Sequence, residues 1–177
     1  MWATYLIRST LKVSWQSLQM QPWSQRSSAV ADLLNPAIIA AAIAAAAVQY
    51  ERRDHTLMPF ELSFLVVPLV LHRDTRTSLP TRVDSHLARW VTSNPLLAAG
   101  FGARAKALTE PVREGIRFGL RCGALHLDGP HLSGQLRRRP AVVGDVTQII
   151  SKAGFVGRWF AQLESSATAF ALLGVKV

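Results

Sequence analysis

The side chains that could support catalysis are few and scattered along this chain of 177 residues. Its single cysteine is Cys122, and no two of its five histidines are four residues apart with a glutamate between them, as a zinc-peptidase helix requires. His126, Asp128 and His131 form the densest group of potential metal ligands, but they flank an Asp-Gly-Pro turn, so a solvated hairpin is the simpler interpretation. The glycines at 100–102 do not follow a clean strand, which makes a phosphate-binding loop improbable. We therefore expect no catalytic residue, no metal ligand and no cofactor.

Positive charge is the more specific chemical feature. The chain has 20 Lys and Arg against 11 Asp and Glu, a net charge of +9, and eight of these basic residues, with only three acids, fall in 100–139. Guanidinium groups stay charged and bind phosphates bidentately, and each neutralised phosphate releases counterions. The candidate residues for contact with double-stranded DNA or another anion are Arg104, Lys106, Arg113, Arg117, Arg121, Arg137, Arg138 and Arg139.

A solvated face or a protein interface explains the same charges. Arg113 can pair with Glu110, and Arg117 with Glu114, at a spacing that places each pair on one helix face. Arg121 and residues 137–139 have no such neighbour in the sequence. Net charge does not distinguish DNA from an acidic protein surface, so both interpretations stay open.

The basic residues fall on a predicted helix followed by a hairpin. Thr109 is suited to an N-cap and Gly123 to a helix C-terminus, which predicts a helix over 110–122. Val112, Ile116 and Leu120 form its apolar arc, and the arginines form an adjacent basic arc. Two short strands, 124–127 and 131–136, surround the turn at 128–130. Cys122, between helix and hairpin, is expected to pack as a small hydrophobic residue.

Other segments are predicted to build the core around this unit. Asn35 as N-cap and Pro36 predict a buried helix over the Ala-rich run 37–50, whose surface could also receive a partner helix. The run 37–48 is about half the length needed to cross a membrane. Residues 62–71 fit a buried strand or a helix kinked at Pro68.

Further helices are expected near 83–93 and 96–108, with Asn94-Pro95 between them. A third helix is expected over residues 145–163, in which Gly154 and Gly157 indicate a kink or a tightly packed neighbour. The apolar tail 167–175 is expected to close the fold as an edge strand. The predicted class is α+β, predominantly helical, with a winged-helix-like module whose wing is the hairpin.

The predicted domain covers residues 35–177, after an N-terminal extension, 1–34, that is poor in acids. This extension fits a mobile arm, a transit peptide, or a start codon assigned too early with Met20 as the true one. A single cysteine and the absence of a secretory pattern indicate a reducing, cytoplasmic location.

Three segments in this order resemble a known family. They are LLNPAIIAAAI at 33–43, FLVVPLVLHRDTRTSLP at 64–80, and KAGFVGRWFAQ with ALLGV within 152–175. A tryptophan-bearing helix at Arg89-Trp90 lies between them. From Leu33 onward the chain resembles the middle component of bacterial three-component ABC-ATPase conflict systems, to which the small subunit of Lamassu-type anti-phage systems belongs.

This resemblance implies a cytoplasmic bacterial adaptor rather than an enzyme or a membrane protein. Its expected partners are an SMC/Rad50-like ABC ATPase, an effector that is commonly a nuclease, and DNA. The most recognisable positions, Phe155, Gly157, Arg158 and Trp159, are expected to serve packing or a partner interface. The alternative function is a free-standing winged-helix transcriptional regulator that binds duplex DNA on its own. A small enzyme would need catalytic groups assembled only by the fold.

Overall fold

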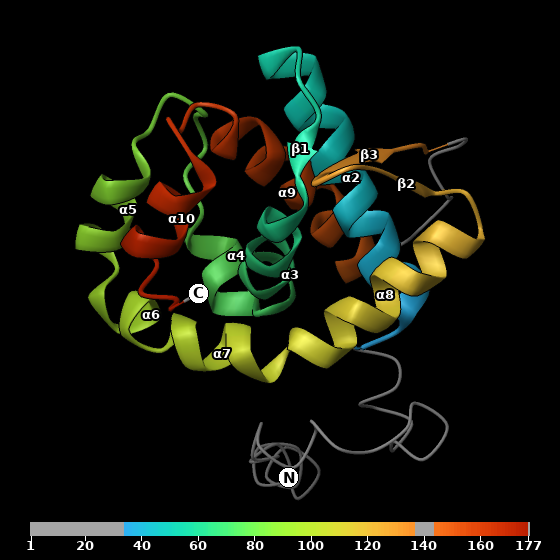
Figure 1. Ribbon diagram of the computed structural model, residues 1–177. Coiled ribbons are helices and arrows are strands. Elements are labelled where there is room, and N and C mark those ends of the chain that lie inside the picture. The colour runs from blue at the N-terminus through green and yellow to red at the C-terminus, as the bar shows by residue number, and fades with distance from the viewer. Residues whose placement is uncertain (1–33, 137–143, 177) are drawn as a thin grey trace, which may run out of the picture.

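The computed structural model describes residues 34–136 and 144–176 as a predominantly helical protein with one small antiparallel sheet (Figure 1). The elements, in chain order, are α2 (Pro36–Asp54), β1 (Met58–Pro59), the 3₁₀ turn η3 (Phe60–Leu62), α3 (Ser63–Leu71), α4 (Arg73–Ser78), α5 (Leu87–Ser93), α6 (Pro95–Ala99), α7 (Phe101–Ala107), α8 (Thr109–Arg121), β2 (Leu125–Asp128), β3 (His131–Gly134), α9 (Asp145–Phe160) and α10 (Ser166–Leu172).

Helix α2 is the centre of the core, as its sequence predicts. The Asn35 side chain accepts a hydrogen bond from the backbone N–H of Ala37, and Pro36 occupies the first turn. Small side chains around the whole circumference let α8, α9 and β3 approach from different sides (Figure 1). The helix continues to Asp54, four residues beyond the predicted run 37–50, and stops at His55 in the left-handed conformation.

The contact between α2 and α9 depends on glycine. Helix α9 continues through both Gly154 and Gly157, so the tightly packed neighbour is the correct one of the two interpretations. A Cβ atom added at Gly157 would lie 2.1 Å from the carbonyl oxygen of Ala46, well inside van der Waals contact. The two helix backbones therefore touch at a distance that only glycine permits.

The apolar run with Pro68 forms a helix, α3, rather than a strand, and nearly all of it is buried. The charged segment that follows forms α4, a second short helix. Gly100 divides the single helix expected over 96–108 into α6 and α7. The chain changes direction around the core between α3 and α4 and again between α6 and α7 (Figure 1).

The sheet has the strand order β1-β3-β2, with both pairings antiparallel. The predicted hairpin is confirmed: Leu127 pairs with Leu132, and Gly129 takes a positive φ in the turn. Strand β1, which was not predicted, adds Met58 opposite Leu132. The inner face of the sheet contributes the buried side chains of Leu125 and Leu132 to the core.

The prediction that the C-terminal tail forms an edge strand is wrong. Residues 166–172 form helix α10, because the Ser165 hydroxyl caps the helix by accepting a hydrogen bond from the backbone N–H of Thr168. The segment is also rich in Ala and Leu, which favour helix, and the β-branched residues after Thr168, Val175 and Val177, both follow the last helical residue. Ala169 and Phe170 bury the inner face of this helix.

Candidate interaction surface

Helix α8 is strongly amphipathic, and its inner face rests on α2. Val112 and Ile116 are buried, confirming two of the three positions of the predicted apolar arc. Gly115 is so close to Ile39 that an added Cβ would lie 2.4 Å from a methyl carbon of that side chain. This close contact fixes which side of α8 faces solvent.

The outer face of α8 carries three arginines at one-turn spacing. Arg113, Arg117 and Arg121 are all exposed, as expected for the basic arc. Arg113 forms the predicted ion pair with Glu110, a contact between exposed groups that contributes little to stability. Within residues 34–136 and 144–176, Arg117 and Arg121 form no ion pair or hydrogen bond with another side chain. Their guanidinium groups are available to a binding partner.

Large apolar side chains flank this line of arginines. Phe118 is 39% exposed and Leu120 is 38% exposed, on opposite sides of Arg117 around the helix axis. The prediction that Leu120 continues the buried arc is therefore wrong. Gly119 takes the inward position of the last turn, against Ala40 and Leu125, and this rotates Leu120 toward solvent.

The end of α8 adjoins the foot of the hairpin. The backbone N–H of Ala124 donates to Gly119, and the N–H of Gln135 donates to Ala124. Leu136, also exposed, follows directly. Cys122 is exposed as well, so the expectation that it packs as a small hydrophobic residue is wrong: the chain turns at this point before the strand begins.

Arg104 lies apart from this face. Its Nη2 donates to the carbonyl oxygen of Leu97 at 2.7 Å and lies 3.4 Å from Thr75 Oγ1, while the guanidinium sits 5.7 Å from the ring centroid of Phe101. Burial lowers the pKa of Arg104. Because these internal contacts occupy its guanidinium, we leave Arg104 out of the candidate surface.

The remaining basic candidates divide between exposed and undescribed positions. Lys106 is exposed on α7. Arg137, Arg138 and Arg139 lie outside the residues that the structure describes. The candidate surface defined here is therefore the outer face of α8: Arg113, Arg117, Phe118, Leu120 and Arg121.

The four α9 positions named for packing or a partner interface lie in or beside the core. Phe155, Gly157 and Trp159 are buried, and Trp159 Nε1 donates to the backbone carbonyl of Ser85. The Trp159 ring meets Trp90 edge-to-face at 6.1 Å. Arg158 is half-buried, and its Nη1 donates to Gln49 Oε1 at 2.7 Å. All of these contacts are made within the described chain.

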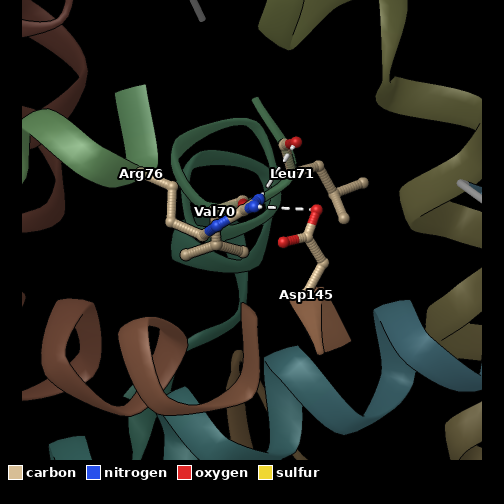
Figure 2. A network of polar contacts seen from close by, with 4 residues as sticks. All are labelled: Val70, Leu71, Arg76 and Asp145. Atoms are coloured by element: carbon tan, nitrogen blue, oxygen red, sulfur yellow. Dashed lines mark hydrogen bonds and ion pairs between the residues drawn. The ribbon is translucent and has the colours of Figure 1, made fainter. Parts of the chain in front are cut away.

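The structure reveals a buried arginine that the sequence does not distinguish from its exposed neighbours. Arg76 is 3% exposed, and its Nη1 donates to the carbonyl oxygen of Val70 at 2.7 Å, near the C-terminal end of α3. Its Nη2 lies 3.4 Å from Asp145 at the start of α9 (Figure 2). A cation there satisfies helix carbonyls and opposes the negative end of the α3 dipole.

His72 belongs to the same corner of the molecule. Its Nδ1 accepts a hydrogen bond from the backbone N–H of Thr75 at 3.2 Å and lies 2.8 Å from the Thr75 hydroxyl, which makes it the N-cap of α4. Burial, and then the positive charge of Arg104, lower the pKa of His72. The neutral ring is the form that can accept the capping bond.

Over 34–136 and 144–176, no three His, Cys, Asp or Glu side chains gather as a metal site would require. In the same ranges, no helix has both the length and the apolar character to span a bilayer.

Fold and surface together define a small helical protein with a closely packed core and one exposed helix face suited to macromolecular contact. No curated protein and no solved structure gives a significant match to the chain. The chain does match a family model over residues 23–177, that of the ABC-three component (ABC-3C) system Middle Component 3. It belongs to this family. The match begins at residue 23, inside the segment that the sequence resemblance left out.

Proposed function

We propose that this protein is a non-catalytic accessory subunit that bridges an SMC/Rad50-like ABC ATPase and a nuclease effector in a Lamassu-type anti-phage system of the bacterial cytoplasm. Membership of the middle-component family carries the proposal, because a middle component of a multi-component ABC system has partner components, an ATPase among them. The bridging role, the nuclease and the defence setting are the parts that we add to this family assignment.

The architecture is consistent with an adaptor. The core around α2 is packed at backbone distance against α9, which gives a rigid body. On this body, α8 presents a charged and partly apolar face that the rest of the described chain leaves exposed. A rigid body with an exposed, chemically mixed face is suited to hold other subunits in a fixed arrangement.

Contact with DNA forms part of the proposal at the level of the assembled complex. Lys106 is exposed on α7, and exposed basic groups attract phosphates over the range of the Debye length. The alternative is a free-standing winged-helix regulator. The order of α8 followed directly by the β2–β3 hairpin favours that alternative, since a recognition helix precedes the wing in such proteins.

Co-expression of the tagged chain with its genomic neighbours, followed by mass spectrometry of the purified material, tests the proposal. We expect a stable complex that contains an ABC ATPase and an effector. Omitting this chain should separate the ATPase from the effector while each keeps its own catalytic activity. A chain that purifies alone as a dimer and shifts duplex DNA with a steep salt dependence would favour the regulator instead.

A further inference from the structure

We infer that the outer face of α8 is a docking site for an acidic amphipathic helix of a partner subunit. This inference rests on the proposed function, because it assigns the surface by which the accessory subunit joins its complex. The face is defined by Arg113, Arg117, Phe118, Leu120 and Arg121, all exposed.

Charge complementarity specifies the partner's polar groups. Arg117 and Arg121 lie one helical turn apart and have no carboxylate partner among residues 34–136 and 144–176. Two carboxylates spaced by one turn on a facing helix match this arrangement, and each can accept a bidentate pair of hydrogen bonds. Such pairs are worth more in an interface than on the free surface, because docking removes the screening water.

The apolar side chains favour protein over DNA. Phe118 and Leu120 flank Arg117 and remain 39% and 38% exposed. A phosphate backbone gives these side chains nothing apolar to pack against, and protein–DNA interfaces are more polar than protein–protein interfaces. Aromatic residues and arginine, in contrast, are enriched at protein interfaces, where lysine is depleted. The basic side chains of this face are all arginine.

The face is also preorganised for docking. At Gly115 and Gly119 the α8 backbone packs directly against the side chains of Ile39 and Leu125, with no room for a Cβ atom between them. The exposed side chains therefore project from a fixed backbone, which lowers the entropic cost of binding. Leu136, exposed beside the end of α8, extends the apolar margin toward the hairpin.

Two paired variants of the complete complex separate charge from apolar contact. The charge variant is Arg117→Glu with Arg121→Glu, and its control is Arg52→Glu with Arg53→Glu, which makes the same charge change at exposed positions on α2. The apolar variant is Phe118→Ser with Leu120→Ser, and its control is Leu96→Ser, at a leucine that is 89% exposed on α6. The side chains changed in both variants and in both controls are exposed. We therefore expect each protein to keep its fold, which circular dichroism checks.

We expect each α8 variant to lower the amount of partner subunit retained on the tagged chain by at least about tenfold, and each control to retain wild-type amounts. Cys122 gives a second measurement on the unmutated protein. It is the single cysteine of the chain and is exposed one residue beyond α8. Docking should slow its alkylation by a maleimide by about tenfold or more, measured by mass spectrometry of this subunit.

Three results would overturn the inference. Full retention of partners by both α8 variants, with Cys122 labelled at the rate of the isolated chain, would place the interface elsewhere. Loss of binding to a duplex oligonucleotide in the charge variant alone, with assembly intact in both, would make the face a DNA site. Failure of the wild-type chain to assemble with any neighbour would remove the proposed function and the docking site together.

Discussion

Replacing Gly157 with alanine should destabilise the protein, whereas the same replacement at Gly154 should not. Both glycines lie within α9 and both face α2. At Gly157 the added Cβ would lie 2.1 Å from the carbonyl oxygen of Ala46, a backbone atom in a buried helix. At Gly154 the nearest atom is the flexible Cγ of Gln49, at 3.2 Å.

The expected change in stability of each variant is the sum of two opposing effects. Alanine in place of glycine inside a helix stabilises it by about 1 kcal/mol, and this gain applies to both positions. Relieving the contact at Gly157 requires the α2 and α9 backbones to separate, and overpacking of this kind costs about 1–3 kcal/mol. We expect a cost at the upper end of this range, because a backbone atom cannot rotate away from the added methyl group. After the gain in helix propensity is subtracted, Gly157→Ala should lower the free energy of unfolding by about 2 kcal/mol. Gly154→Ala should change stability by between zero and about 1 kcal/mol in the favourable direction.

Urea unfolding followed by circular dichroism at the helix band measures both variants. The midpoint should fall for Gly157→Ala and stay level or rise for Gly154→Ala, with equal slopes. In thermal melts, about 2 kcal/mol corresponds to a decrease in Tm of about 4–8 °C for a chain of this size. Because helix propensity is common to both variants, their difference measures the cost of the backbone contact alone.

Equal stability of the two variants would refute this account of the α2–α9 interface. So would a Gly157→Ala protein as stable as wild type, since it would mean that the helices can accommodate a methyl group between them. A reduced slope in urea, by comparison, would indicate that the variant lost cooperativity rather than local packing.

Three further predictions, made with four substitutions, test the interior. Arg76→Met should lower the free energy of unfolding by about 2–3 kcal/mol, because it leaves α3 carbonyls without their charged donor. Asp145→Asn should lower it by less than about 1 kcal/mol, since Asp145 is 67% exposed. Equal losses in urea unfolding would contradict the assignment of the carbonyls as the main partners of Arg76. Trp159→Ala should lower the free energy of unfolding by about 3–5 kcal/mol, because the side chain is buried in the core. An unchanged melting temperature would contradict this core role. The lowered pKa of His72 means that the folded state binds fewer protons than the unfolded state, so stability should decrease as the pH falls below about 6.5. His72→Asn retains a capping oxygen for the Thr75 N–H and should flatten this dependence; the same pH slope in both proteins would assign the effect to another group.

Several features of the candidate surface were predictable because their signals are local. The predicted helix over 110–122 lies within one residue of α8 at each end, and the turn at 128–130 places the hairpin. The prediction that Thr109 is the N-cap is wrong: Leu108 occupies that position, and the Thr109 hydroxyl donates to the carbonyl oxygen of Ala105 instead. Arginines at one-turn spacing share a face of any helix. The exposure of Leu120 and Cys122 was not predictable from spacing, because it depends on where Gly119 meets α2 and on where the chain turns.

The segments predicted incorrectly show where local signals are weak. Residues 167–175 are apolar enough for strand or helix, and the cap at Ser165 decides for helix. Gly100 shortens one expected helix into α6 and α7. Strand β1 has only two residues and exists through its pairing with Leu132 and His131, a contact between segments far apart in the chain.

The sequence by itself determined the predominantly helical fold with a small antiparallel hairpin, the central helix from Asn35, the amphipathic α8, and the family resemblance. Caps, turns and helical periodicity act over a few residues, so their effects are visible in the order of residues alone. Only the tertiary structure decided that Arg76 is buried between α3 and α9, and that Arg104 turns inward to Leu97 while Arg117 and Arg121 stay outside. The fate of a charged side chain depends on which distant carbonyls and helix ends the fold brings beside it, and that information is not contained in its neighbours along the chain.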